Sequence, residues 1–217
     1  MTAYRLLALD IDGTLLRRDK TISPRTHAAL DAARAAGVHV VLVTGRRYPA
    51  ARRVAEMLSG PTDLVLHNGA LIVEAQARDP GADGEVLGRT PDGAFILHRR
   101  LLPRELARRA VRAGRAASVQ PVVHAGPCGE GRLLIEAAPR SDTLLAYYLD
   151  RSHPDVVQVD DLVAALEQGE EPLQVMFGGA SADMDRLHPG LMAELAGEAS
   201  VERTVYPDSG VGLLDVL

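Results

Sequence analysis

Two aspartates, two residues apart, follow the first apolar segment of this 217-residue chain. Asp10-Ile11-Asp12-Gly13-Thr14 comes directly after residues 4–9, an almost continuous apolar run that is typical of a parallel strand buried on both faces. Ligands of open α/β sheets bind beyond the carboxyl ends of the strands. Because an unpaired carboxylate is costly to bury, two aspartates at this place indicate a partner for their charge. Mg²⁺ is a natural partner, because it takes one or two carboxylates together with substrate phosphate. The plainer alternative is a turn with two solvated aspartates.

Two more polar turns that contain glycine follow the next two predicted strands. Thr44-Gly45-Arg46 comes after residues 38–43, and Asn68-Gly69-Ala70 comes after residues 64–66. The threonine hydroxyl and the backbone N–H groups of the first turn can hold a phosphate oxygen, and the helix predicted from Pro49 directs its N-terminus there. Arg46 either adds charge to this site or belongs to a solvated face. Three such turns after successive strands predict one anion site at a single edge of the sheet.

The elements between these turns have the order strand, helix, strand, helix, strand. Ser23 and Pro24 are typical of a helix start, and Gly37 of a helix end. A second helix is expected over residues 49–58. This order predicts a parallel sheet with right-handed crossovers, and therefore an α/β fold.

The second half of the chain has a different pattern. Residues 78–93 are rich in Gly, Asp, Pro and Arg and predict a loop or hairpin tip. Helices alternate with strands after it, which predicts an α+β domain with a mostly antiparallel sheet. Strands are expected at 95–98, 121–125, 132–136, 156–159, 173–177, 200–205 and 211–217, and helices at 103–117, 142–150, 160–167 and 182–195.

Composition excludes several classes of protein. The net charge of −5 argues against a nucleic-acid-binding surface, and the single cysteine, Cys128, excludes an internal disulfide framework. No apolar run reaches the roughly 18 residues of a membrane-spanning helix, and the segment around Asp10 lacks the pattern expected of a signal peptide. The expected location is therefore cytoplasmic, while the oligomeric state is not indicated. Lys20 is the only lysine among 24 basic residues, which we interpret as a bias of genome composition.

The three turns, with Leu9 to Leu16 as the first motif, resemble the motifs of the haloacid dehalogenase superfamily. More narrowly, they resemble the Cof-type phosphatases that carry a large α+β cap (subclass IIB). The resemblance covers the whole chain. It implies a Rossmannoid core with an incomplete parallel sheet over residues 1–101 and an inserted α+β cap domain over residues 102–217.

The family has two more motifs after its cap, a lysine in a Gly-Val-Ser-Lys-Gly context and a Gly-Asp loop. Neither is found in this sequence, so the C-terminal core segment is expected to be absent. Lys20 precedes the second motif and cannot be that lysine by its order in the chain. Without the strands that flank the first strand in the family, residues 6–9 are expected to form an apolar edge strand.

The resemblance also implies a role for each motif residue. Asp10 would be the nucleophile that forms an aspartyl-phosphate, and Asp12 would protonate the leaving alkoxide and then activate water. Mg²⁺ would bind the Asp10 carboxylate and the Asp12 backbone carbonyl. The substrate would be a small phosphorylated metabolite, such as a sugar phosphate. The positions implied for phosphate binding are Thr44, Gly45, Ile11 and Gly13, with Arg46 and Asn68 on the substrate side.

Two other functions are weighed against this phosphatase. One is a non-catalytic remnant that binds phosphate or a metabolite, because each missing charge-stabilising group typically costs about 2.7–4 kcal/mol of transition-state stabilisation. The other is a receiver-type signalling domain. A receiver needs its phosphoacceptor aspartate after the third strand, where this chain has His67 and Asn68, so the sequence excludes it.

Overall fold

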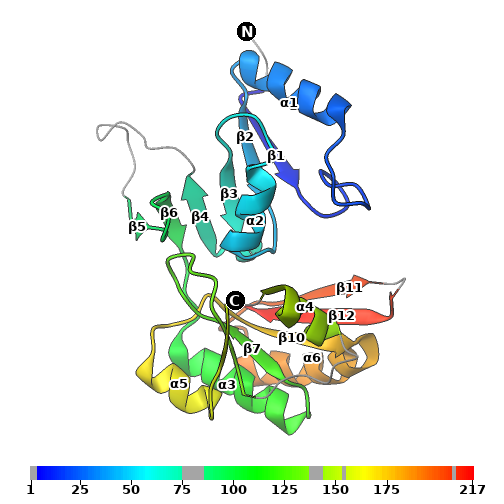
Figure 1. Ribbon diagram of the computed structural model, residues 1–217. Coiled ribbons are helices and arrows are strands. Elements are labelled where there is room, and N and C mark those ends of the chain that lie inside the picture. The colour runs from blue at the N-terminus through cyan, green and yellow to red at the C-terminus, as the bar shows by residue number, and fades with distance from the viewer. Residues whose placement is uncertain (1–3, 75–85, 137–143, 153–154, 207–208) are drawn as a thin grey trace. The chain divides into compact units, whose positions relative to one another are not determined.

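The computed structural model describes residues 4–74, 86–136, 144–152, 155–206 and 209–217 (Figure 1). The chain divides into two compact units. Unit 1 is Met1–Arg100 with Cys128–Glu130, and unit 2 is Leu101–Pro127 with Gly131–Leu217. Each unit has its own six-stranded sheet. The resulting mixture of α/β and α+β architecture agrees with the fold class predicted from the sequence.

The sheet of unit 1 has the strand order β1-β2-β3-β4-β6-β5. Its first three strands are parallel and are connected through helices, as predicted, and its last three are antiparallel. Strands β4 and β5 were not among the expected strands. The elements are β1 (Leu6–Asp10), α1 (Pro24–Ala35), β2 (His39–Val43), α2 (Tyr48–Ala55), β3 (Asp63–Leu66), the 3₁₀ turn η1 (His67–Gly69), β4 (Leu71–Glu74), β5 (Gly88–Arg89) and β6 (Phe95–Arg99).

Helix α1 begins and ends where the sequence signals are. The Ser23 hydroxyl oxygen accepts a hydrogen bond of 3.0 Å from the Thr26 N–H, which satisfies a free donor of the first turn, and Pro24 is the first helical residue. Gly37 follows the helix with φ +81°, a conformation that glycine adopts at little cost. The predicted cap and stop are confirmed.

Strand β1 lies at one edge of this sheet and pairs only with β2 in the described part of the chain. The prediction that it is buried on both faces is wrong, because Leu6 is 58% exposed and Ala8 is exposed as well. Strand β2, which has a neighbour on each side, buries its three central residues. The predicted apolar edge strand is confirmed.

The sheet of unit 2 has the order β11-β12-β10-β7-β8-β9 and is antiparallel except for the β8–β9 pair. This confirms the predicted mostly antiparallel sheet. Figure 1 shows α3, α5 and α6 on one face and α4 on the other. The elements are α3 (Arg104–Ala116), β7 (Pro121–His124), β8 (Leu133–Ile135), α4 (Leu144–Ser152), β9 (Val156–Gln158), α5 (Leu162–Gln168), β10 (Gln174–Ala180), α6 (Ser181–Leu195), β11 (Val201–Tyr206) and β12 (Val211–Val216).

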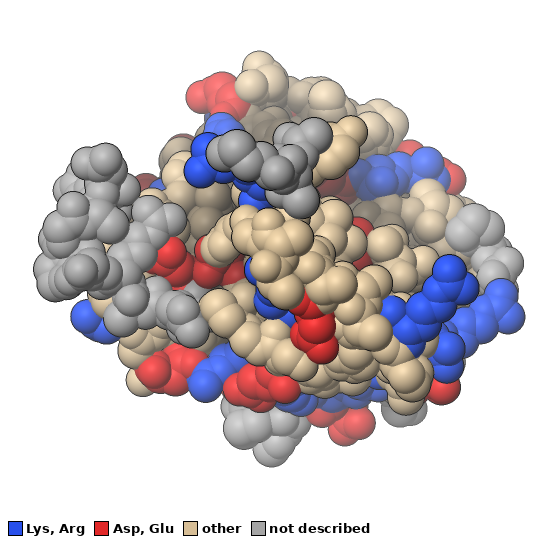
Figure 2. All heavy atoms as spheres, turned by 90° about the horizontal axis from the view of Figure 1, so that it is seen from above, with Lys and Arg blue, Asp and Glu red and all other residues tan. Residues whose placement is uncertain are grey.

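Three of the five arginines of α3, namely Arg108, Arg109 and Arg115, pair with carboxylates. Arg109 contacts Glu198 at 2.8 Å and Glu194 at 3.4 Å, and Arg108 contacts Glu167 at 3.0 Å. On the face of the molecule seen in Figure 2, blue and red side chains are interspersed. The ion pairs of Arg108 and Arg109 indicate that this face of α3 is a charged surface balanced by carboxylates. Among the described residues, no helix combines the length and the apolar character that crossing a membrane requires.

Candidate active site

The loop after β1 alternates buried and exposed residues. Ile11 is fully buried, whereas the side chains of Asp10 and Asp12 are exposed on either side of it. The Leu16 N–H donates to the Ile11 carbonyl at 2.9 Å and closes a turn in which Gly13 has φ +81°. Burial of Ile11 therefore anchors the loop while the side chains on either side of it reach the surface.

The loop after β2 contacts the loop after β1 through an ion pair between Arg46 and Asp12. Val43 is in register with Asp10 on β1 and with Val65 on β3, so the three parallel strands end level with one another. Arg46 donates from Nε and Nη2 to the two carboxylate oxygens of Asp12, at 2.6 and 2.7 Å. This two-point pairing is the strong form of an arginine–carboxylate contact.

Thr44 is buried beside this ion pair, and its Oγ1 accepts a hydrogen bond of 3.2 Å from the Arg46 N–H. A hydroxyl that accepts one bond retains its own hydrogen to donate. Thr44 can therefore offer an O–H to an anion held at this edge of the sheet.

The loop after β3 packs against the second loop. The His67 N–H donates to the Arg46 carbonyl at 3.3 Å. A Cβ atom added to Gly45 would lie 2.7 Å from the Asn68 Oδ1, so a larger residue there requires this amide to move. The structure thus brings together all three turns that the sequence singled out, with Asn68 in contact with the second loop.

Two further residues lie at this site that the sequence analysis did not assign to it. The Thr14 hydroxyl donates to Asp10 Oδ2 at 3.2 Å, and the Lys20 Nζ lies 3.3 Å from Asp12 Oδ1. Thr14 is part of the first motif and could have been found there. For Lys20 the only signal in the sequence is that it is the sole lysine, a feature that we interpret as a bias of genome composition.

The charge state of Asp12 follows from these neighbours. The hydrogen bond from the Arg46 guanidinium holds the pKa of the Asp12 carboxyl below its ordinary value of 3.8. Partial burial opposes this effect, and the charge of Arg46 and the contact with Lys20 add to it. Asp12 is therefore a carboxylate at neutral pH.

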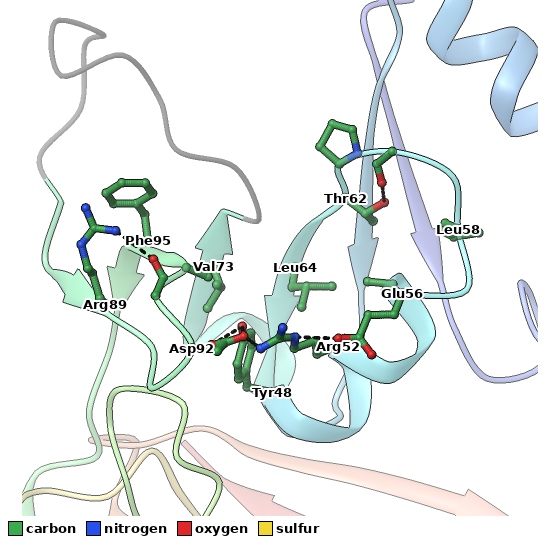
Figure 3. A pocket seen from close by; sticks show the side chains of 15 residues that line it. Tyr48, Arg52, Glu56, Leu58, Thr62, Leu64, Val73, Arg89, Asp92 and Phe95 are labelled. Carbon is green, nitrogen blue, oxygen red and sulfur yellow. Dashed lines mark hydrogen bonds and ion pairs between the residues drawn. The ribbon is translucent and has the colours of Figure 1, made fainter.

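A pocket of about 470 Å³ lies beside α2 in the same unit (Figure 3). Its apolar side chains include Leu64, Val73 and Phe95, and none of its lining residues belongs to the three motifs. The Tyr48 hydroxyl donates to Asp92 at 2.9 Å, and Arg52 pairs with the same carboxylate. These contacts connect α2 to the turn before β6. The pocket wall thus steadies the helix that follows Thr44-Gly45-Arg46.

Residues 7–80 match the family model of haloacid dehalogenase-like hydrolases. This segment contains all three turns. The match and the similar fold of solved haloacid dehalogenase phosphatases agree with the resemblance of this chain to that superfamily. The family resemblance recognised in the motifs is confirmed.

Individual relatives agree with this placement. The phosphoglycolate phosphatase of Natronomonas pharaonis is 39% identical over 88 residues, which are 41% of this chain and 35% of the relative. The crystal structure of TM0651 from Thermotoga maritima matches 98% of this chain and 69% of its own chain, with a TM-score of 0.70 and 16% identity. The subclass IIB sugar phosphatase BT4131 matches 98% and 69%, with a TM-score of 0.62 and 15% identity.

The chain spans only part of these relatives. The matched segment covers 24–35% of the length of the first three curated relatives, and the two solved structures are covered to 69%. The solved structures therefore establish the fold, and the activity is inferred from the site.

Proposed function

We propose that this chain provides the nucleophile and part of the phosphate site of a Mg²⁺-dependent phosphatase that acts on a small phosphorylated metabolite. The observation that carries the proposal is the convergence of Asp10 and Asp12 with the Thr44-Gly45-Arg46 turn at the level ends of three parallel strands. Unit 1 would be the N-terminal part of the catalytic core, and unit 2 its cap. The names of a phosphoglycolate phosphatase and a sugar phosphatase among the similar proteins support the substrate class.

The residues present fit a magnesium ion whose remaining coordination positions are filled by water and substrate. In the described part of the chain, no group of three or more His, Cys, Asp or Glu side chains is arranged to hold a metal. The Asp10 carboxylate and the Asp12 backbone carbonyl are hard oxygen donors, and Mg²⁺ commonly binds one or two carboxylates together with phosphate. When bound, the ion would neutralise charge on the phosphoryl oxygens.

The chemistry assigned to the side chains balances in two steps. A carboxylate oxygen of Asp10 forms a bond to phosphorus while the bond to the ester oxygen breaks, and Asp12, which must first take up a proton from solvent, gives that proton to the ester oxygen. Asp12 then removes a proton from water, which attacks phosphorus and releases phosphate and the Asp10 carboxylate. The Thr44 hydroxyl and the Gly45 backbone hold the phosphoryl oxygens during both steps, and Ile11 and Gly13 shape the loop beside them.

Hydrolysis of p-nitrophenyl phosphate in the presence of Mg²⁺ tests this function. Asp10→Asn should lower kcat/KM by at least about a thousandfold, because it removes the nucleophile. Asp31→Asn is the matched control, since Asp31 is an exposed aspartate on α1 of the same unit. Turnover by Asp10→Asn at the native rate would contradict the proposal, as would a native chain that hydrolyses no phosphate ester.

A non-catalytic phosphate-binding protein is the second candidate, and the ion-paired state of Asp12 favours it. Arg46 keeps Asp12 ionised, whereas the first step needs a proton on this residue. Binding of inorganic phosphate without hydrolysis of any ester would identify this second function. The cytoplasmic location expected from the sequence stays a prediction.

A further inference from the structure

The loop between β1 and α1 places the ammonium group of Lys20 beside the Asp12 carboxylate. We propose that Lys20 is a further phosphate-binding residue of this site, which uses its ammonium group to bind the dianionic phosphoryl group next to Asp12. The Lys20 Nζ lies 3.3 Å from Asp12 Oδ1, and the side chain is 61% exposed. The inference rests on the proposed function, from which it takes a phosphoryl group as the ligand.

The backbone of Lys20 has an uncommon conformation. Its φ is +63°, in the left-handed region that a residue with a Cβ atom rarely adopts. The described residues contain five non-glycine residues of this kind, and three of them lie in the loops after β1 and β3. They are Lys20, His67, Asn68, Ser118 and Ala196. Strained backbone collects at ligand sites, where the surrounding structure holds it in place.

Hydrogen bonds fix the turn that carries Lys20. The Arg17 N–H donates to the Thr21 carbonyl at 2.9 Å, and the Lys20 N–H donates to the Arg17 carbonyl at 3.0 Å. Asp19 Oδ1 accepts from the Thr21 N–H at 3.1 Å and from the Thr21 hydroxyl at 2.7 Å. The turn is thus shaped before any ligand arrives, and it presents the lysine on the side of Asp12.

The pairing of Asp12 leaves the ammonium group available. Arg46 already occupies both carboxylate oxygens at 2.6 and 2.7 Å, so the longer contact with Lys20 is the weaker of the two. An ammonium group has three donors, and only one is directed at Asp12. An exposed ion pair contributes little stability and does not account for a strained turn. Binding of a phosphoryl group by the two remaining donors would give the strained turn a function.

The affinity of the full chain for inorganic phosphate in the presence of Mg²⁺, measured by isothermal titration calorimetry, tests the proposal. Lys20→Met should weaken phosphate binding by at least about tenfold, because a charge-assisted hydrogen bond is lost. Lys20→Arg should remain within about threefold of the native chain, since it keeps the charge. Arg18→Met is the matched control, because it removes one positive charge from the same loop.

The outcomes separate this inference from the proposed function. Native-like phosphate affinity in Lys20→Met, an equal loss in Arg18→Met, or no phosphate binding by the native chain would each overturn the role of Lys20. If phosphate binds through Lys20 while no ester is hydrolysed, the phosphatase fails and the inference stands. If Asp10→Asn abolishes turnover while Lys20→Met binds phosphate normally, the phosphatase function stands and the role of Lys20 fails.

Discussion

Gly45 and Asn68 come from different loops and fit each other at the scale of single atoms. Gly45 is outside the left-handed region, so an alanine there meets no backbone strain but collides with the Asn68 amide oxygen. We expect Gly45→Ala to destabilise the native chain by about 1 kcal/mol, at the low end of the cost of overpacking. In an Asn68→Ala background it should be neutral or stabilising, because alanine restricts the unfolded chain.

Urea unfolding of the four proteins measures this coupling as a double-mutant cycle. If the changes in the free energy of unfolding from Gly45→Ala and Asn68→Ala simply add, the Asn68 amide is not packed against Gly45. Phosphate affinity, measured on the same proteins, shows whether this packing also supports the ligand site.

The residue types of the site could be predicted from the sequence, because each motif follows directly on an apolar strand. Asp10, Thr44 and Asn68 lie at one edge of the sheet for the reason the sequence suggested, namely that the parallel strands before them end level. Lys20 could not be predicted in this way. Its approach to Asp12 depends on a left-handed backbone turn, which leaves no periodic or motif-like pattern in a sequence.

At the scale of elements, Gly114 shows how α3 packs on the sheet of unit 2. Glycine is normally unfavourable inside a helix, by about 1 kcal/mol relative to alanine. Here a Cβ would collide with the ring of Phe177, which is fully buried on β10, and would lie 3.0 Å from the Val119 carbonyl oxygen. We expect Gly114→Ala to destabilise the chain by about 1–3 kcal/mol, despite its better helix propensity.

Gly190 on α6 is the matched control for this prediction. It is exposed inside a helix, and a Cβ there would meet no atom within 4 Å. Gly190→Ala should therefore stabilise the chain by about 0.5–1 kcal/mol. Thermal unfolding of both variants checks the pair, and two shifts of the same sign would contradict the packing argument.

Helices and strands with clear periodicity or caps could be predicted, whereas contact-dependent features could not. Ser23 marks the start of α1 because its side chain acts locally. Strand β5 is only two residues long, which is too short to give a pattern. The burial of β1 depends on whether a second strand lies beside it, which the strand's own residues do not encode.

At the scale of the whole molecule, strand β1 lies at an open edge of the sheet of unit 1. Its backbone is unpaired on one side in the described part of the chain, and Leu6 and Ala8 are exposed along it. Such an edge is a template for pairing with another strand, and proteins commonly protect it with a charged side chain. We therefore expect the isolated chain to self-associate through β1.

Leu6→Lys should weaken that self-association by about tenfold or more. Burying a leucine side chain contributes about 1.5–3 kcal/mol, and each 1.4 kcal/mol is a factor of ten in affinity. Met57→Lys is the matched control, because Met57 is 41% exposed in the same unit but lies outside the sheet. Sedimentation velocity over a range of protein concentrations measures both variants. If Met57→Lys weakens association as much as Leu6→Lys does, general surface charge rather than strand pairing controls it, and the β1 edge is not the contact between copies.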